Sequence, residues 1–350
     1  MASGFNALQS NSSGYANTAC GESALLLNTT GFHNTAVGTS AMRNNTTASY
    51  NTATGVTALY YNAANYNTAD GYKALYNTST GSFNTGTGSL ALLYNTTGYG
   101  NAAVGAMSLQ NNTTGFHNAG YGSGALGSNI TGFDNTAIGG GADVTYDDLM
   151  GATAIGSFAA TNADDKIVIG TTLSNNQTGG YGNWQSFSDG RFKDNVQANV
   201  PGLVFVKKLH PVTYTLNAEK VDEFMGIRQR IDSCRNAVEK SRYLSRLEEV
   251  SSQLQTGFIA QEVEAAANSI GYNFDGVHHP QNEKDNYTIG YASFVVPLVK
   301  SVQELDAKND AQQLKIENQE LKIEEQQEAI DILKKQNELL LLRIEKLETK

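Results

Sequence analysis

A short stretch, Gly31-Phe32-His33-Asn34-Thr35-Ala36-Val37-Gly38, recurs through the first half of the chain at a nearly constant interval. Its asparagine returns every 17 residues, with a single step of 16, at Asn17, Asn34, Asn51, Asn67, Asn84, Asn101, Asn118 and Asn135. Its last glycine keeps the same steps from Gly21 to Gly139, and Gly156 opens a ninth, degenerate unit. Self-similarity at a fixed period is typical of solenoids and fibres, in which each unit buries its apolar face only against its neighbours.

Alternation within the unit predicts a strand with one packed face and one wet face. Side chains two apart share a face, so Asn34, Ala36 and Gly38 lie together. The Ala36 position holds only Ala or Gly in the other units, which indicates close packing, whereas the Val37 position varies freely and is expected to face water. The Ala-Leu pair of each unit, such as Ala24-Leu25, supplies bulky apolar contact, and the Asn-Thr-Thr-Gly run forms the turn.

The small amount of apolar surface per unit bears on the oligomeric state. One small and one large apolar residue per unit is little to set against a conformational entropy of about 1–2 kcal/mol per residue. We therefore expect an obligate oligomer, in which chains wind side by side and the small-residue face becomes a shared interior. Aromatic residues at the unit starts are expected to pack under a turn, in preference to forming a ladder that stacks on sugars.

Charge separates the chain into two halves. Residues 1–185 carry 3 Lys or Arg and 8 Asp or Glu, of the 24 and 34 in the whole chain. The rest has the charge content of a globular domain, about one quarter. The net charge of −10 argues against nucleic acid or an anionic membrane as partner. No apolar run is long enough to span a bilayer, so no membrane insertion is expected.

Metal and cofactor sites are not expected from the sequence. Cys20 and Cys234 fit no metal spacing and are interpreted as unpaired thiols. His33 and His117 occupy equivalent positions of two units, and three copies around an axis could hold a metal. Other units place Ala, Tyr, Phe or Asp there, so a surface position is favoured.

The second half shows ordinary strand and helix signals. Short apolar runs predict strands over 167–169, 203–206, 211–216 and 257–260, the last leading into a helix over 261–267. Apolar residues at helical spacing indicate a long amphipathic helical stretch over 218–254, which is interpreted as an insertion.

Heptads fill the last segment. The a positions are Val302, Asn309, Ile316, Ile323, Ile330, Asn337 and Ile344. The d positions are Leu298, Leu305, Gln312, Gln319, Gln326, Leu333, Leu340 and Leu347. Ile at a with Leu at d suits a dimer, whereas the Gln and Asn layers suit a three-fold axis. A coiled coil is predicted over 298–350, and a trimer is favoured because the fibre and the coil must share one stoichiometry.

Ser188-Asp189-Gly190-Arg191-Phe192-Lys193 lies where the repeat array gives way to the charged half. A lysine in a dry site loses its proton more readily and can then activate a serine hydroxyl. The spacing of Ser188 and Lys193 alone is equally compatible with a solvated turn.

Several motifs resemble a known family. The repeat unit resembles the head repeats of trimeric adhesins and their bacteriophage tail-fibre relatives. Residues 186–305 are similar to the endosialidase-type intramolecular chaperone of phage tailspikes and fibres, a self-cleaving peptidase. The matching pieces are Ser188-Asp189 with Lys193, Leu209-His210-Pro211-Val212-Thr213-Tyr214, Gly257-Phe258-Ile259-Ala260-Gln261-Glu262-Val263, and Tyr291 to Val299 followed by Gln303-Glu304-Leu305.

The resemblance implies a maturation device that trimerises, aligns three fibre strands and then cuts itself away. It implies that Ser188 and Lys193 are catalytic and that the Ser188–Asp189 bond is cut, with Asp189 or a neighbouring protomer assisting. Attack by the serine through a five-membered ring would instead cut Phe187–Ser188, whereas attack on its own carbonyl would need a strained four-membered ring.

The expected organisation combines the residue pattern with the resemblance. We expect a mainly β repeat fibre with a trimeric, adhesin-head-like solenoid, then an α+β chaperone domain, then a trimeric coiled coil. The boundaries are 1–166 for the repeats, 167–187 for a connecting β segment, 188–297 for the chaperone and 298–350 for the coil. The resemblance implies a homotrimeric tail fibre of a virion or an extracellular injection apparatus, made in the host cytoplasm. Its partners would be a bacterial surface receptor, glycan or protein, and other tail proteins.

Three alternatives stay open. A surface-anchored trimeric adhesin needs a secretion signal and a membrane anchor, whereas residues 317–350 read as charged helix. An uncleaved structural fibre would share the repeats and the coil without peptidase activity. A glycan-degrading enzyme would need paired carboxylates, which the acid-poor repeats do not offer.

Overall fold

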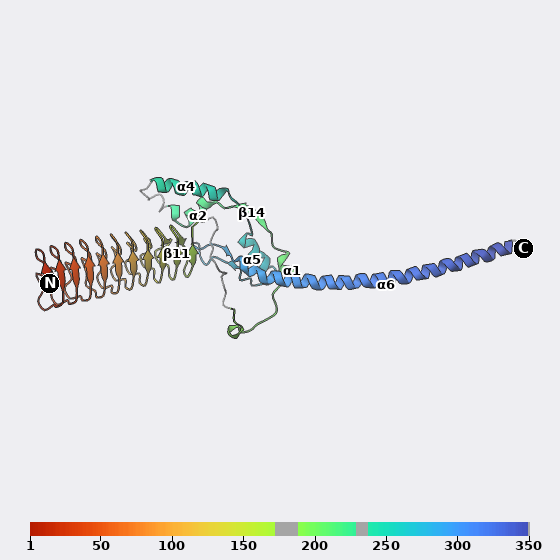
Figure 1. The fold of residues 1–350 in the computed structure, drawn as a ribbon, viewed down its shortest axis with the longest axis horizontal. Helices are drawn as coiled ribbons and strands as arrows, with labels where there is room; N and C mark the ends of the chain where they lie inside the picture. Colours follow the sequence, from red (N-terminus) through yellow and green to blue (C-terminus); the bar gives the residue numbers. More distant parts are fainter. Residues whose placement is uncertain (172–187, 229–236, 349–350) are drawn as a thin grey trace. The chain divides into compact units, whose positions relative to one another are not determined.

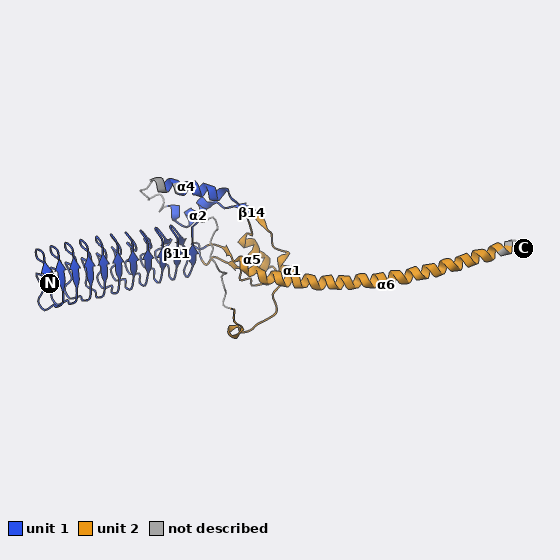
Figure 2. Cartoon of the chain, in the orientation of Figure 1, with its two compact units in different colours: residues 1–185, 213–255, 282–285 blue, residues 186–212, 256–281, 286–350 orange. Residues whose placement is uncertain are grey.

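The computed structural model describes residues 1–171, 188–228 and 237–348. The chain divides into two compact units, drawn in different colours in Figure 2. The first unit comprises residues 1–185, 213–255 and 282–285. The second comprises residues 186–212, 256–281 and 286–350.

The repeats form a β-solenoid with one parallel sheet of 11 strands, each paired with its neighbour in the next repeat (Figure 1). The strands are β1 (Ala2–Ser3), β2 (Thr18–Cys20), β3 (Thr35–Val37), β4 (Thr52–Thr54), β5 (Thr68–Asp70), β6 (Thr85–Thr87), β7 (Ala102–Val104), β8 (Ala119–Tyr121), β9 (Thr136–Ile138), β11 (Thr153–Ile155) and β13 (Ile167–Ile169). A second, two-stranded parallel sheet joins β10 (Asp143–Val144) to β12 (Ala160–Thr161). The register pairs Ala19 with Ala36 and Ala36 with Ala53, which confirms the predicted repeat geometry.

The interior of the solenoid is filled by side chains of a single chain. Ala36 is fully buried and belongs to one cluster with Leu25 and their equivalents in the other repeats. The expectation that the small-residue face is shared between chains is therefore wrong, because the Leu column of the same chain already covers it. Val37 is 38% exposed, which confirms a wet outer face.

The buried leucines reach the interior through an unusual backbone conformation. Leu25 has φ 51° and Leu59 has φ 48°, in the left-handed region. This region costs a non-glycine residue about 1–2 kcal/mol. Full burial of a leucine side chain stabilises by about 1.5–3 kcal/mol, which offsets that strain. Gly38 has a more extreme φ of 128°, and a Cβ there would lie 2.5 Å from the carbonyl oxygen of Gly55.

The recurring asparagine links each turn to the next. Asn34 is fully buried, and its Nδ2 donates to the Ala48 carbonyl at 2.8 Å. Its Oδ1 accepts from the backbone N–H of Asn51 at 3.0 Å. A second asparagine ladder runs through the turns, where Nδ2 of Asn45 donates to Oδ1 of Asn28 at 2.9 Å. Both ladders satisfy buried polar groups that would otherwise lack partners.

Aromatic rings stack on one another along the solenoid. Tyr50 stacks on Tyr66, and Tyr66 on Phe83, each pair with centroids 5.0 Å apart and nearly parallel planes. Tyr66 is 47% exposed and Phe83 is 63% exposed. These three rings directly precede the recurring asparagine. The unit-start rings form a separate column, in which Tyr15 stacks on Phe32 with centroids 4.9 Å apart and Phe116 stacks on Phe133 at 4.6 Å.

The remainder of unit 1 contains helices and strand residues of one short two-stranded sheet. β14 (Val212–Thr215) pairs with β15 (Leu254–Gly257), which confirms the strand predicted over 211–216. Helices α2 (Ala218–Phe224) and α4 (Ala237–Ser252) lie within the described part of the expected helical stretch. Ile231 and Cys234 of that stretch lie outside the described residues.

Unit 2 contains a small mixed region and one long helix. Its elements are η1 (Gly190–Phe192), α1 (Leu203–Val206), α5 (Ala260–Asn268), β16 (Val277–His278), β17 (Thr288–Ile289), η2 (Tyr291–Phe294) and α6 (Val295–Glu348). The helix predicted over 261–267 is confirmed by α5. The strand predicted over 257–260 lies earlier in the chain, because β15 ends at Gly257 and α5 begins at Ala260. α6 is continuous over 54 residues (Figure 1).

The strand predicted over 203–206 is wrong, because these residues form helix α1. A four-residue apolar run has no periodicity that separates a strand from a helix. Tertiary contacts decide: Phe205 is fully buried in a cluster with Phe274 and Phe294. The first amide of the helix, that of Leu203, donates to Oε2 of Glu304 at 2.8 Å.

Candidate functional site

Ser188 and Lys193 are brought together by a single helical turn. Asp189 caps the one-turn helix η1, and its side chain accepts a hydrogen bond from the Arg191 amide at 2.9 Å. The Lys193 amide closes the turn on the Gly190 carbonyl at 3.3 Å. Five residues of separation thereby become a direct contact, in which Nζ of Lys193 lies 2.8 Å from Oγ of Ser188.

Asp189 is held by a partner that sequence reasoning did not single out. Nη2 of Arg191 lies 2.6 Å from Oδ2 of Asp189, and Nε donates to the same oxygen at 2.9 Å. These side-chain hydrogen bonds, with that from the Arg191 amide, lower the pKa of Asp189 and keep it ionised. The same pairing raises the pKa of Arg191. The signal available in the sequence was the Asp-x-Arg spacing, since a capping carboxylate attracts a cation at this distance.

The dyad is open to solvent within one chain. Ser188 and Lys193 are both exposed, and Asp189 is half-buried. A lysine amine is most readily neutral where burial disfavours its charge. The described residues of a single chain do not supply the dry surroundings that the sequence argument assumed. Activation of Ser188 by a neutral Lys193 amine therefore requires that another surface bury the two side chains.

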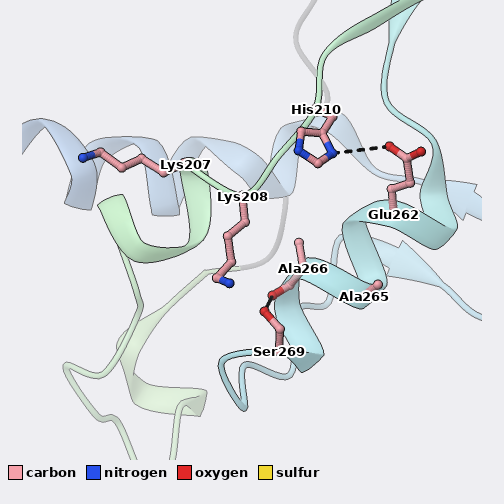
Figure 3. A pocket seen from close by; sticks show the side chains of 7 residues that line it. All are labelled: Lys207, Lys208, His210, Glu262, Ala265, Ala266 and Ser269. Atoms are coloured by element: carbon pink, nitrogen blue, oxygen red, sulfur yellow. Dashed lines mark hydrogen bonds and ion pairs between the residues drawn. The ribbon is translucent and has the colours of Figure 1, made fainter.

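A pocket of about 590 Å³ lies in the same unit, where the end of α1 faces α5 (Figure 3). It is lined by Lys207, Lys208, His210, Glu262, Ala265, Ala266 and Ser269. Nδ1 of His210 lies 3.8 Å from Oε2 of Glu262, so the structure brings together two motifs that are far apart in sequence. Two further lysines make the pocket rim cationic.

The other residues considered from sequence have surface roles. His33 stacks on Tyr50 with ring centroids 5.4 Å apart, and Nδ1 of His117 lies 3.4 Å from Oδ1 of Asp134. Cys20 is an exposed free thiol. Within the described ranges, His, Cys, Asp and Glu side chains form no group of three suited to a metal. None of the described helices combines the length and the apolar character that crossing a membrane requires.

Comparison with known proteins identifies one domain. Residues 188–272 match the family described as chaperone of endosialidase. The matched segment begins at Ser188 and contains Lys193, His210 and Glu262. No curated protein matches the chain, and no solved structure does. The matched domain and the β-solenoid before it fit a tail-fibre-like protein with a C-terminal chaperone.

Proposed function

We propose that the chain is a trimeric tail-fibre protein whose C-terminal part directs assembly and is then cut from the fibre at the Ser188–Asp189 bond. The observation that carries this proposal is the 2.8 Å contact between Lys193 Nζ and Ser188 Oγ, at the start of the matched segment. The proposed parts are the fibre over 1–166, a connecting segment over 167–187, the chaperone over 188–297 and the coil over 298–350.

The long helix supports the proposed trimer. Ile323 is 63% exposed and Ile330 is 45% exposed at a positions, and Leu340 is 53% exposed at a d position. A helix gains most of its stability by burying such an apolar stripe against other elements. Association of α6 with its copies would bury the stripe as a coiled coil. A three-fold axis also accommodates its Gln and Asn layers.

The proposed reaction is a hydrolysis in two steps. Oγ of Ser188 in one chain attacks the carbonyl carbon of the Ser188–Asp189 bond in a neighbouring chain, and its proton passes to a neutral Lys193 amine. The C–N bond then breaks, and the Asp189 nitrogen takes that proton as it leaves. Water hydrolyses the resulting ester and restores the serine hydroxyl, as in other covalent mechanisms.

The geometry favours a serine supplied by a neighbouring copy. Attack of Ser188 on its own carbonyl would need a four-membered ring. Help from the Asp189 carboxylate is disfavoured because that group is committed to Arg191. A neighbouring protomer would also cover the exposed dyad and favour the neutral amine. We therefore propose that cleavage follows trimer assembly and occurs between chains.

Co-expression tests the proposal. A Ser188→Ala chain and a wild-type chain carry different affinity tags, and mixed trimers are isolated through both tags. We expect the Ser188→Ala chain to be cut in mixed trimers and to stay intact when expressed alone. Mass spectrometry should give fragments 1–188 and 189–350. Lys193→Ala in all chains should abolish cutting, whereas Lys335→Ala, at an exposed lysine of α6 outside the dyad and the pocket, should not.

Two results would count against this proposal. A wild-type trimer that stays intact indefinitely would exclude self-cleavage, and a monomeric mass by light scattering would exclude the trimer. The exposure of both dyad residues favours one second candidate, an uncleaved fibre with the same assembly domain, which the first result would support. In either case we propose that the solenoid contacts a receptor on a bacterial surface.

A further inference from the structure

Two segments that follow Ser188 in sequence belong to the same compact unit as the solenoid. These docked segments, residues 213–255 and 282–285, group with residues 1–185 (Figure 2). The Ser188–Asp189 bond lies between the solenoid and both docked segments along the chain. A cut at this bond therefore leaves the solenoid on one fragment and its docked segments on the other.

An apolar cluster fastens the longer docked segment to the end of the solenoid. Ala160 of β12 is buried in this cluster. Its docked partners are Ala218, Ile227, Tyr243, Leu247 and Val250. Leu247 is 1% exposed, so its side chain is removed from water almost completely. The Thr145 hydroxyl adds a hydrogen bond to the Met225 carbonyl at 3.2 Å.

Polar contacts fasten the shorter docked segment to the same turns. Nδ2 of Asn162 donates to the Lys284 carbonyl at 2.6 Å. Nζ of Lys166 lies 3.5 Å from Oδ1 of Asp285, whose side chain is 2% exposed. The Lys284 ammonium lies 4.1 Å from the centre of the Tyr146 ring. A buried carboxylate with a cationic partner makes loss of either group costly.

We infer that the docked segments hold the downstream fragment on the solenoid after the chain is cut, so that cutting and release are separate steps. The inference concerns the fate of the fragments and rests on the proposed function for the position of the cut. Release would require the docked segments to leave Ala160, Asn162 and Lys166, and this would uncover a partly apolar surface on the last turns. The occupant that fits this surface is the chain's own residues 213–255 and 282–285.

An artificial cut tests docking without relying on self-cleavage. A recognition sequence for a specific protease is inserted between Gln197 and Ala198, both exposed, in a Ser188→Ala chain. After digestion, size-exclusion chromatography should show the two fragments eluting together. Asp285→Ala and Leu247→Ala should each raise the dissociation constant of the fragments at least about tenfold, the scale set by 1.4 kcal/mol.

Matched controls separate docking from general damage. Glu283→Ala removes an exposed neighbour of Asp285, and Leu254→Ala truncates a leucine that is 72% exposed. Both controls should leave co-elution unchanged. Asp285→Ala keeps the apolar cluster intact, so it tests docking even if Leu247→Ala unfolds its segment.

The inference is overturned if the cut fragments separate without any docking substitution. It is also overturned if they elute together equally well when Asp285→Ala and Leu247→Ala are combined. Failure of the wild-type chain to cut itself would refute the proposed function alone, because the inserted site does not use Ser188.

Discussion

Replacing Asn101 with aspartate tests whether the asparagine ladder holds the solenoid together. Asn101 is 1% exposed, and its Nδ2 donates to the Gly115 carbonyl at 2.8 Å and to Oδ1 of Asn84 at 3.1 Å. Its Oδ1 accepts from the amide of Asn118 at 2.9 Å. Asn101→Asp keeps the shape and the acceptor but replaces the donor with a second oxygen.

The magnitude follows from these contacts. The Gly115 carbonyl loses a buried partner, at about 1–3 kcal/mol. Burial of a charged carboxylate that faces two other oxygens adds about 2 kcal/mol or more. A loss of about 3–5 kcal/mol should accelerate amide hydrogen exchange in β7 and β8 by about 100-fold or more, since each factor of ten corresponds to 1.36 kcal/mol.

The pH dependence gives the experiment a second readout. Burial and the opposing oxygens raise the pKa of an aspartate at position 101 above its unfolded value. The native state then binds more protons than the unfolded state, so stability falls as pH rises between the two values. Protection measured by mass spectrometry should recover near pH 4, where a protonated carboxyl can again donate to Gly115.

The exposed Asn111 provides the matched control. Its Nδ2 donates to the Gly127 carbonyl at 2.7 Å, at a site where water can replace the bond. Asn111→Asp should change protection by less than about 0.5 kcal/mol. Unchanged protection for Asn101→Asp at pH 7, or an equal loss at both pH values, would refute the reasoning.

Three further outcomes are expected. Thr78→Asn should stabilise by about 1–2 kcal/mol in denaturant unfolding followed by exchange, because an amide there can join the turn ladder between Asn62 and Asn95; a loss of stability would contradict this. Gly105→Ala should destabilise by more than about 3 kcal/mol, since φ is +128° and a Cβ would lie 2.5 Å from the Gly122 carbonyl oxygen; near-native exchange would show that the turn can adjust. The hydrogen bonds from Arg191 lower the pKa of Asp189, so their contribution to stability is present above the unfolded pKa of about 3.9 and is lost as pH falls through the folded pKa. NMR titration should show the pKa of Asp189 rising in Arg191→Gln.

Much of the fold was readable from the repeat because geometry restricts those positions. Asn34, Ala36 and Gly38 recur at one interval, and each position has a physical requirement. Asn34 needs an amide side chain that makes two hydrogen bonds, Ala36 needs a small side chain, and Gly38 needs a positive φ. The sequence did not show whether the interior of the solenoid is filled by one chain or shared between chains. The pattern predicted that the Ala-Leu pair supplies apolar contact. Because leucine disfavours a positive φ, the pattern did not indicate that Leu25 closes the core within one chain.

The candidate site was readable only in part. Ser188 and Lys193 were identified as a pair, and the contact follows from a turn that Asp189 caps. The role of Arg191 was missed because a surface arginine two residues from an aspartate is common in solvated loops. The solvent exposure of the pair could not be predicted, since it depends on packing that motifs do not specify.

An interruption of the turn ladder of asparagines makes the solenoid mechanically uneven. Thr78 replaces an asparagine of the turn ladder, and its hydroxyl donates to the Leu75 carbonyl of its own turn. Ring stacking changes column in the same region: the column in which Tyr66 stacks on Phe83 is followed by Gly100, whereas Tyr99 stacks on Phe116 in the column one position earlier in the repeat. A fibre pulled along its axis should therefore part near residues 78–99, as two blocks. In an optical trap, Thr78→Asn should raise the rupture force, and rupture at the ends only would contradict this weak point.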